Sequence, residues 1–180
     1  MDYYASMYLY VVPSSKLCNH GPHRHTHTTG TTMSRRVMRG FDPEDFTRAR
    51  ISAGLSRQDL ARLSRTGRAT IDNWENGKAT PQIDALVRVA AVLNLTPESF
   101  IKIPPDRRYP GDWRVIRGLT QPQLAAATAL STTTIGAIER GEVALTDSNA
   151  ATIAAILDLT PAAYRAAYER ARTRPPGTPA

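Results

Sequence analysis

The sequence has 180 residues, a formal net charge of +7, and 41% hydrophobic residues. This length suits one ordinary domain or two small ones, and the apolar fraction excludes a wholly disordered chain. The positive charge favours a polyanionic partner, because Lys and Arg gain affinity by releasing counterions condensed on phosphate. The single cysteine, Cys18, excludes an intrachain disulfide, and the longest apolar run, residues 7–12, is too short to span a membrane. We therefore expect a cytoplasmic protein without a membrane partner.

Residues 1–32 show no apolar periodicity, and residues 20–32 consist only of Gly, Pro, His, Arg and Thr. This composition predicts a disordered tail. Because a basic arm and a capped helix follow Met33, we hypothesise that translation begins there and that the tail is an over-extended start. Imidazole and thiolate groups in the tail could bind a soft divalent metal, but the segment has no scaffold to fix their geometry. We expect no metal site and no cofactor from these residues, which are Cys18, His20, His23, His25 and His27.

An internal repeat organises the rest of the chain. A shift of 64 residues aligns residues 50–100 with residues 114–164 without a gap and gives fifteen identical pairs. Between the copies lies a proline-rich stretch, which predicts a short, fairly stiff linker. The predicted segments are a tail at 1–32, a first domain at 33–103, a linker at 104–111, a second domain at 112–172 and a disordered C-terminus at 173–180.

The first copy is predicted to be helical throughout. Asp42 can cap a helix that starts at Pro43 and ends before Gly54. Ser56 and Asp59 form a capping pair for the second helix. A tight turn at 65–67 then leads to a third helix.

This third helix, from Arg68 to about Asn76, buries Ile71 and Trp74 and is closed by Gly77. A fourth helix and a short fifth follow, and no stretch alternates with the period of a strand. The sequence therefore predicts an all-α chain of two tandem five-helix domains.

Two short helices joined by a tight turn form a helix-turn-helix. In residues 54–61 and 70–78 the first copy resembles the Cro and lambda-repressor-like (XRE-type) family, and residues 118–125 and 134–141 resemble it again. The resemblance implies that the third helix of a copy enters the major groove of double-stranded DNA.

In the first copy, the resemblance places Arg68, Ala69 and Asn73 at base-reading positions. Arginine can donate two hydrogen bonds to guanine, asparagine fits adenine, and an alanine methyl can touch thymine. Five further residues are implied to contact phosphate, namely Ser56, Arg57, Thr70, Asn76 and Lys78.

Two pairs are expected to be structural. The family joins an arginine of the first helix to a glutamate at the end of the third, and both copies keep this pair, as Arg50/Glu75 and Arg114/Glu139. Loss of one partner would leave the other charge buried.

The second copy has different chemistry. Residues 46–102 contain nine basic and five acidic residues, a net of +4, whereas residues 110–170 contain five and six, a net of −1. Ala137 and Glu142 replace Asn73 and Lys78. Four residues remain possible DNA contacts, namely Gln121, Thr132, Thr133 and Arg140, although the second copy could instead be a docking module for a protein partner or a second chain.

We interpret the chain as a sequence-specific DNA-binding transcription regulator, a repressor whose main reader is the first copy. An antitoxin or a protein-interaction module with the same fold remains the alternative. No enzyme is expected, because outside the tail there is no histidine, no cysteine nucleophile and no glycine-rich phosphate loop.

Overall fold

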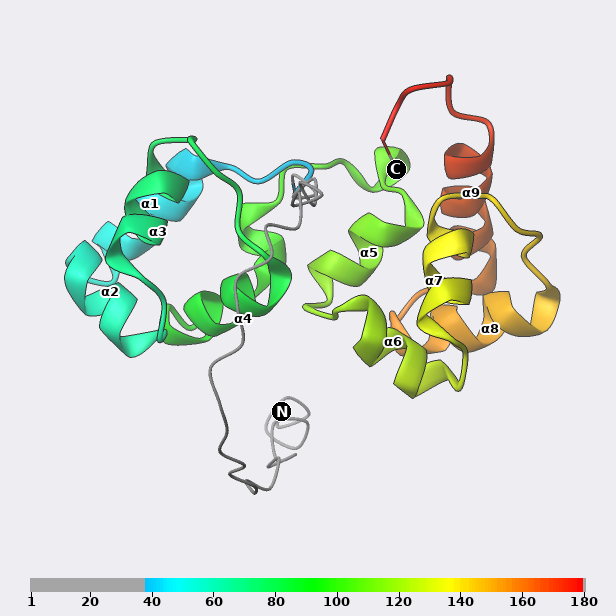
Figure 1. The fold of residues 1–180 in the computed structure, drawn as a ribbon, viewed down its shortest axis with the longest axis horizontal. Helices are drawn as coiled ribbons and strands as arrows, with labels where there is room; N and C mark the ends of the chain where they lie inside the picture. The colour runs from blue at the N-terminus through cyan, green and yellow to red at the C-terminus, as the bar shows by residue number, and fades with distance from the viewer. Residues whose placement is uncertain (1–37, 180) are drawn as a thin grey trace, which may run out of the picture. The chain divides into compact units, whose positions relative to one another are not determined.

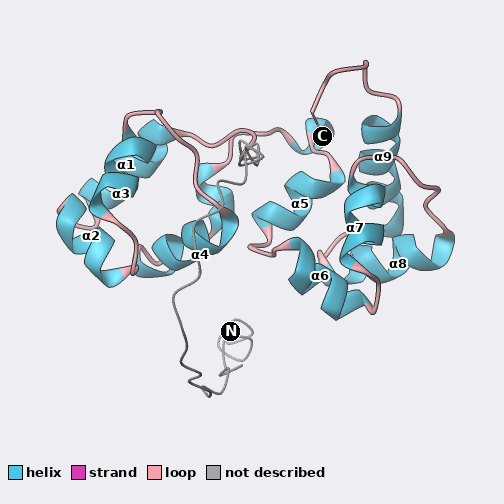
Figure 2. Cartoon of the chain, in the orientation of Figure 1, coloured by secondary structure: helices cyan, strands magenta, loops and turns pink. Residues whose placement is uncertain are grey.

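The computed structural model describes residues 38–179, so the predicted tail, with its histidines and Cys18, lies outside the described residues. Between residues 38 and 179 the chain is helical and contains no strand (Figure 2). An isolated antiparallel bridge in the same range joins Phe41 to Ile101. The all-α fold is therefore confirmed for this part of the chain.

Two sets of five helical segments follow each other along the described chain (Figure 1). The first domain, as we call the first set, comprises α1 (Pro43–Ser52), α2 (Arg57–Leu63), α3 (Arg68–Glu75), α4 (Ile83–Val92) and the 3-10 helix η2 (Pro97–Phe100). The second domain comprises α5 (Pro110–Ile116), α6 (Gln121–Thr128), α7 (Thr132–Glu139), α8 (Asp147–Ile156) and α9 (Pro161–Arg172). A short 3-10 helix, η3 (Pro105–Arg107), lies between the two sets in sequence.

Capping residues set the bounds of α1. The carboxylate of Asp42 accepts hydrogen bonds from the backbone N–H groups of Glu44 and Asp45, at 2.9 and 3.0 Å. Pro43 occupies the first helical position, where its missing N–H needs no partner. Gly54 follows the helix with a φ of +68°, the left-handed conformation that glycine adopts without steric cost.

The first helix of the second domain begins before the expected start of that domain. Pro110 and Gly111, which the sequence assigned to the linker, form the first turn of α5, because proline's fixed φ suits the first helical position. At the other end, the expectation of disorder covered residues 173–180. Residues 173–179 are described, and Arg174 donates a 2.6 Å hydrogen bond to the carbonyl oxygen of Arg140. The segment after α9 therefore contacts the end of α7.

Each domain has its own apolar core. In the first, the ring of Phe46 packs edge-on against Trp74 and Phe100, with centroids 5.7 and 5.5 Å apart. In the second, Tyr164 and Tyr168 of α9 join the buried leucines and isoleucines. Helix α9 has twelve residues where η2 has four, so the second domain draws more of its core from its last helix.

The two domains also contact each other. Ile101 and Ile103, which follow η2, pack against Ile116 of α5. A second contact is the 2.6 Å ion pair between Arg39, which precedes α1, and Asp112 of α5. Separate expression of either domain would expose this apolar cluster to water, so comparisons between the domains are best made within the full chain.

Candidate nucleic-acid interface

Helices α2 and α3 form a helix-turn-helix with a tight connection. The hydroxyl of the buried Ser64 donates to the carbonyl oxygen of Leu60 at 2.6 Å. Arg65 adopts a left-handed conformation with a φ of +53°, and the N–H of Thr66 donates back to the carbonyl of Ala61 at 2.9 Å. These bonds fix the end of α2 and the turn that leads into α3.

Helix α3 has one buried and one exposed face. Ile71 and Trp74 are buried in the core. On the other face, Arg68, Ala69 and Asn73 are exposed, and 66% of the Arg68 side chain is accessible. The three residues that the sequence assigned to base reading therefore lie on one solvent-facing surface of α3.

A buried ion pair joins the end of this helix to α1. The Nε atom of Arg50 lies 2.5 Å from Oε1 of Glu75, and its Nη1 atom donates to the carbonyl oxygen of Leu55 at 2.8 Å. The Glu75 side chain is only 1% exposed. Burial raises the pKa of the Glu75 carboxyl, but hydrogen bonds from Arg50 and Arg57 outweigh it, so the pKa lies below its ordinary value. Glu75 therefore stays ionised and anchors α3 to α1.

Arg57 is also part of this ion-pair cluster. The sequence assigned it to phosphate, but in the structure its Nε donates to Oε2 of Glu75 at 2.5 Å, while 43% of its side chain stays accessible. The corresponding residue of the second domain, Gln121, donates from Nε2 to Oε2 of Glu139 at 2.7 Å. Both domains thus place a hydrogen-bond donor to the buried glutamate at this position, which the 64-residue repeat aligns as Arg57 and Gln121.

The four other expected phosphate contacts differ in their surroundings. The Ser56 hydroxyl is used in capping, because it accepts from the backbone N–H of Asp59 at 3.1 Å. The amide of Asn76 donates to a carbonyl oxygen of its own helix, that of Asp72, at 2.7 Å. Thr70 is partly buried, and Lys78 is exposed.

A helix-turn-helix family model matches residues 47–100 and, a second time, residues 112–164, together more than half of the chain. The chain belongs to this family. It is therefore a DNA-binding transcription regulator of XRE type with two tandem helix-turn-helix domains, and this family is typically non-enzymatic. Comparison with curated proteins found no match.

The second helix-turn-helix domain presents a different surface. Thr132 and Thr133 are exposed at the start of α7, as Arg68 and Ala69 are on α3. Further along the helix, however, Gly136 and Ala137 are buried, and Ala137 stands at the position of Asn73. The exposed face of α7 is therefore shorter and carries no long side chain at these positions.

The end of α7 is covered by other parts of the second domain. The Arg140 guanidinium forms two hydrogen bonds with the carboxylate of Glu142, at 2.6 and 2.7 Å. Beside it, a Cβ atom added to Gly141 would lie 2.7 Å from the Cα atom of Arg172 in α9. The corresponding Gly77 of the first domain has only Pro43 near it, at 3.9 Å.

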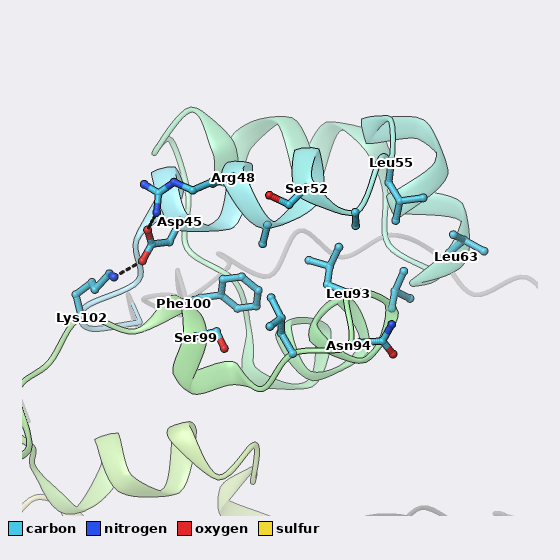
Figure 3. A pocket seen from close by; sticks show the side chains of 14 residues that line it. Asp45, Arg48, Ser52, Leu55, Leu63, Leu93, Asn94, Ser99, Phe100 and Lys102 are labelled. Carbon is cyan, nitrogen blue, oxygen red and sulfur yellow. Dashed lines mark hydrogen bonds and ion pairs between the residues drawn. The ribbon is translucent and has the colours of Figure 1, made fainter.

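A second feature of the first domain is a groove of about 760 Å³ lined by α1, the ends of α2 and α4, and η2 (Figure 3). Leu55, Leu63 and Leu93 line it, and an ion pair between Asp45 and Lys102 lies at one end.

The second domain carries larger side chains at the corresponding positions. Trp113 and Arg117 replace Ala49 and Ala53, which line the groove of the first domain. The Nε atom of Arg117 donates to the carbonyl oxygen of Leu157 at 2.7 Å, so this side chain bridges α5 to the end of α8. The groove is thus a difference between the two domains that the sequence analysis did not identify.

Among the described residues 38–179, no helix is long and apolar enough to cross a membrane, and no group of histidine, cysteine or acidic residues could hold a metal ion.

Proposed function

We propose that the chain is a sequence-specific repressor that binds double-stranded DNA mainly through its first helix-turn-helix domain. The observation that carries this proposal is the contrast between α3, which exposes Arg68 and Asn73, and α7, which has Gly136 and Ala137 buried at the positions of Asp72 and Asn73. Reading a base requires a side chain that reaches the base edges in the major groove. Helix α3 offers such side chains, and α7 does not at these positions.

The proposed roles on α3 follow from side-chain chemistry. The Arg68 guanidinium donates two hydrogen bonds to O6 and N7 of a guanine, a contact worth about 1 to 3 kcal/mol against the wrong base. Asn73 pairs its amide with an adenine, and the Ala69 methyl touches a thymine methyl. The exposure of all three residues is consistent with these roles.

Phosphate contacts position the domain and supply affinity without sequence preference. We assign this role to the exposed Lys78 and to the accessible part of Arg57, supported by the polar groups of Ser56, Thr70 and Asn76. Arg57 contacts phosphate while its Nε stays on Glu75, because a guanidinium has further N–H donors.

We propose an auxiliary role for the second domain. Gln121 is bonded to Glu139 and Arg140 to Glu142, so Thr132 and Thr133 are the residues best placed for a weak DNA contact. A weak contact on a linked domain acts at high effective concentration and can raise affinity without new sequence preference.

The experiment that tests this function is selection of bound DNA from a random pool with the full chain at moderate salt. We expect enrichment of one short sequence that contains a guanine. Placed across a promoter, that sequence should make a reporter gene less active when the chain is present, since the bound chain occludes the polymerase. Failure to enrich any sequence, with the folded chain verified by circular dichroism, would contradict sequence-specific binding.

A second candidate function is protein binding, as in an antitoxin, and the groove of the first domain favours it. Leu63 and Leu95 line this groove and are 47% and 40% exposed. Exposed apolar side chains that gather on one surface are typical of interaction sites. One test is a Leu63→Glu variant of the full chain, whose oligomeric state in solution is compared with that of the wild type. If this variant selects the same DNA but forms a smaller oligomer, the result would support a role of the groove in self-association.

A further inference from the structure

Asp72 of α3 lies between two arginines of the proposed DNA-binding surface. Its Oδ1 atom is 3.4 Å from Nε of Arg57, and its Oδ2 atom is 4.0 Å from Nε of Arg68. The Oδ1 atom is buried and accepts no hydrogen bond from the described residues, and 33% of the Asp72 side chain is accessible.

The order of these two charges on α3 is not the one that stabilises a helix best. A pair of opposite charges four residues apart stabilises a helix best when the acid comes first, in agreement with the helix dipole. Here the arginine comes first, in the first turn, where a positive charge is unfavourable, and the first turn contains no acidic residue. The order of Arg68 and Asp72 along α3 therefore contributes little to the stability of that helix.

DNA binding alone does not explain the carboxylate either. A negative charge on the surface that approaches the phosphates repels them and lowers affinity for every sequence. Such a charge is useful where it raises affinity for one sequence relative to the others.

The second domain lacks the whole arrangement. The 64-residue shift places Gln121, Thr132 and Gly136 at the positions of Arg57, Arg68 and Asp72. All three charged residues are thus absent together from the domain whose α7 exposes a shorter face.

We propose that Asp72 is a positioning residue that orients Arg68 for base reading and lowers binding to other sequences. This inference rests on the proposed function. The carboxylate restricts the long Arg68 side chain to the conformations that present its planar fork to the groove, which reduces the entropy lost on binding. Because it also attracts Arg57 and repels phosphate, it weakens contacts that any DNA could make.

The test compares the full chain with Asp72→Asn, which keeps the shape of the side chain and removes its charge. Affinity is measured for the selected site, for versions of that site with each base changed, and for random DNA. We expect about a tenfold loss of preference at the one base position that Arg68→Ala also relaxes, together with a several-fold gain in affinity for random DNA. In the Arg68→Ala background, Asp72→Asn should cause no further loss of preference at that position.

Two further variants control for indirect effects. Asp84→Asn removes a carboxylate that forms a 3.1 Å pair with Arg88 four residues away on α4, and it should leave the base preference unchanged. Asp72→Glu keeps the charge and should restore part of the preference that Asp72→Asn loses. Thermal unfolding of each variant shows whether the fold is retained.

Three outcomes would overturn the inference. Unchanged base preference with higher affinity for all sequences would mean that Asp72 only repels phosphate. Loss of preference at a base other than the one read by Arg68 would mean that Asp72 contacts a base itself. An equal loss of base preference in Asp72→Asn and Asp72→Glu would mean that the size and shape of the Asp72 side chain matter, and not its charge. If the wild-type chain selects no DNA sequence at all, the proposed function fails instead, and that result is seen before any variant is made.

Discussion

The two helix-turn-helix domains keep the same buried ion pair but differ on the outer face of the third helix. The Nε–Oε1 distance is 2.5 Å in both Arg50–Glu75 and Arg114–Glu139. By contrast, Asn73 is exposed on α3, and Ala137 is buried at the corresponding place on α7. The ion pair that joins the first and third helices is therefore the same in both domains, while this position on the third helix differs in residue and in exposure. A shared fold is thus compatible with a different role for each domain.

The ends of the third helices differ as well. In the second domain, α9 and the residues after it approach the end of α7, and Arg174 bonds to the carbonyl oxygen of Arg140. In the first domain the last helical segment stops at Phe100, and the chain then pairs with Phe41 instead. The longer last helix of the second domain thus occupies space that stays open beside α3.

The largest expected effect concerns the ion pairs that the domains share. Removal of one partner from a buried pair leaves an unpaired charge and costs about 3 to 5 kcal/mol. We expect Glu75→Gln and Glu139→Gln, each made in the full chain, to lower the unfolding midpoint of the domain that carries the change by at least about 10 °C, because a small domain shifts by roughly 4 to 8 °C per kcal/mol. Differential scanning calorimetry measures this shift.

The same variants separate structure from DNA contact. Well below its unfolding midpoint, Glu75→Gln should bind the selected site within about threefold of the wild-type affinity, a small free-energy change. A Glu75→Gln protein of normal stability that no longer binds DNA would show that Glu75 belongs to the interface.

The stability that Glu75 supplies should also depend on pH. Because the folded-state pKa of Glu75 lies below its ordinary value of 4.5, its contribution is complete above that value and is lost as the pH falls through the folded-state pKa. The difference in midpoint between wild type and Glu75→Gln should therefore shrink between about pH 6 and pH 3. A difference that stays constant or widens over this range would mean that the Glu75 charge does not stabilise the fold.

A smaller effect is expected at the glycine that follows each third helix. Gly77 and Gly141 have φ values of +66° and +68°, so alanine at either position costs about 1 to 2 kcal/mol from the left-handed backbone alone. Only at Gly141 would the new Cβ also collide with α9, 2.7 Å from the backbone of Arg172, which adds about 1 to 3 kcal/mol. Urea unfolding of the two variants should therefore show the larger loss for Gly141→Ala. Equal losses would indicate that α9 can move away from α7.

The smallest expected effect is at Lys78. This exposed lysine is assigned to a phosphate, so Lys78→Ala should weaken binding to all sequences about equally and lower the slope of log affinity against log salt by about one unit. Titrations at several salt concentrations give this slope. A change of base preference in Lys78→Ala would assign Lys78 to base reading instead.

Local signals predicted much of the fold. Asp42, Ser56 and the glycines at 54 and 77 set helix bounds through backbone geometry and capping, which depend on a few neighbouring residues. The start of α5 was placed too late, because Pro110 was interpreted as a helix breaker although proline is favourable at the first helical position.

Features of the site that depend on tertiary contacts were harder to predict. The hydrogen bond from Arg57 to Glu75 joins residues eighteen positions apart, and it forms only because α2 and α3 pack against each other. The approach of α9 to Gly141 likewise depends on where a later helix lies. Sequence periodicity indicates which face of a helix is buried, but it does not say what covers the helix end.

The measurement that tests the central claim most directly compares matched changes in the two domains of the full chain. One variant carries Arg68→Ala and Asn73→Ala, and the other carries Thr132→Ala and Thr133→Ala. For each, the affinity for the selected site is divided by the affinity for random DNA. The account predicts that the first variant loses at least about tenfold in this ratio, since each base contact is worth about 1 to 3 kcal/mol. It predicts that the second stays within about threefold of wild type. A larger loss in the Thr132→Ala, Thr133→Ala variant than in the first would contradict the assignment of base reading to the first domain.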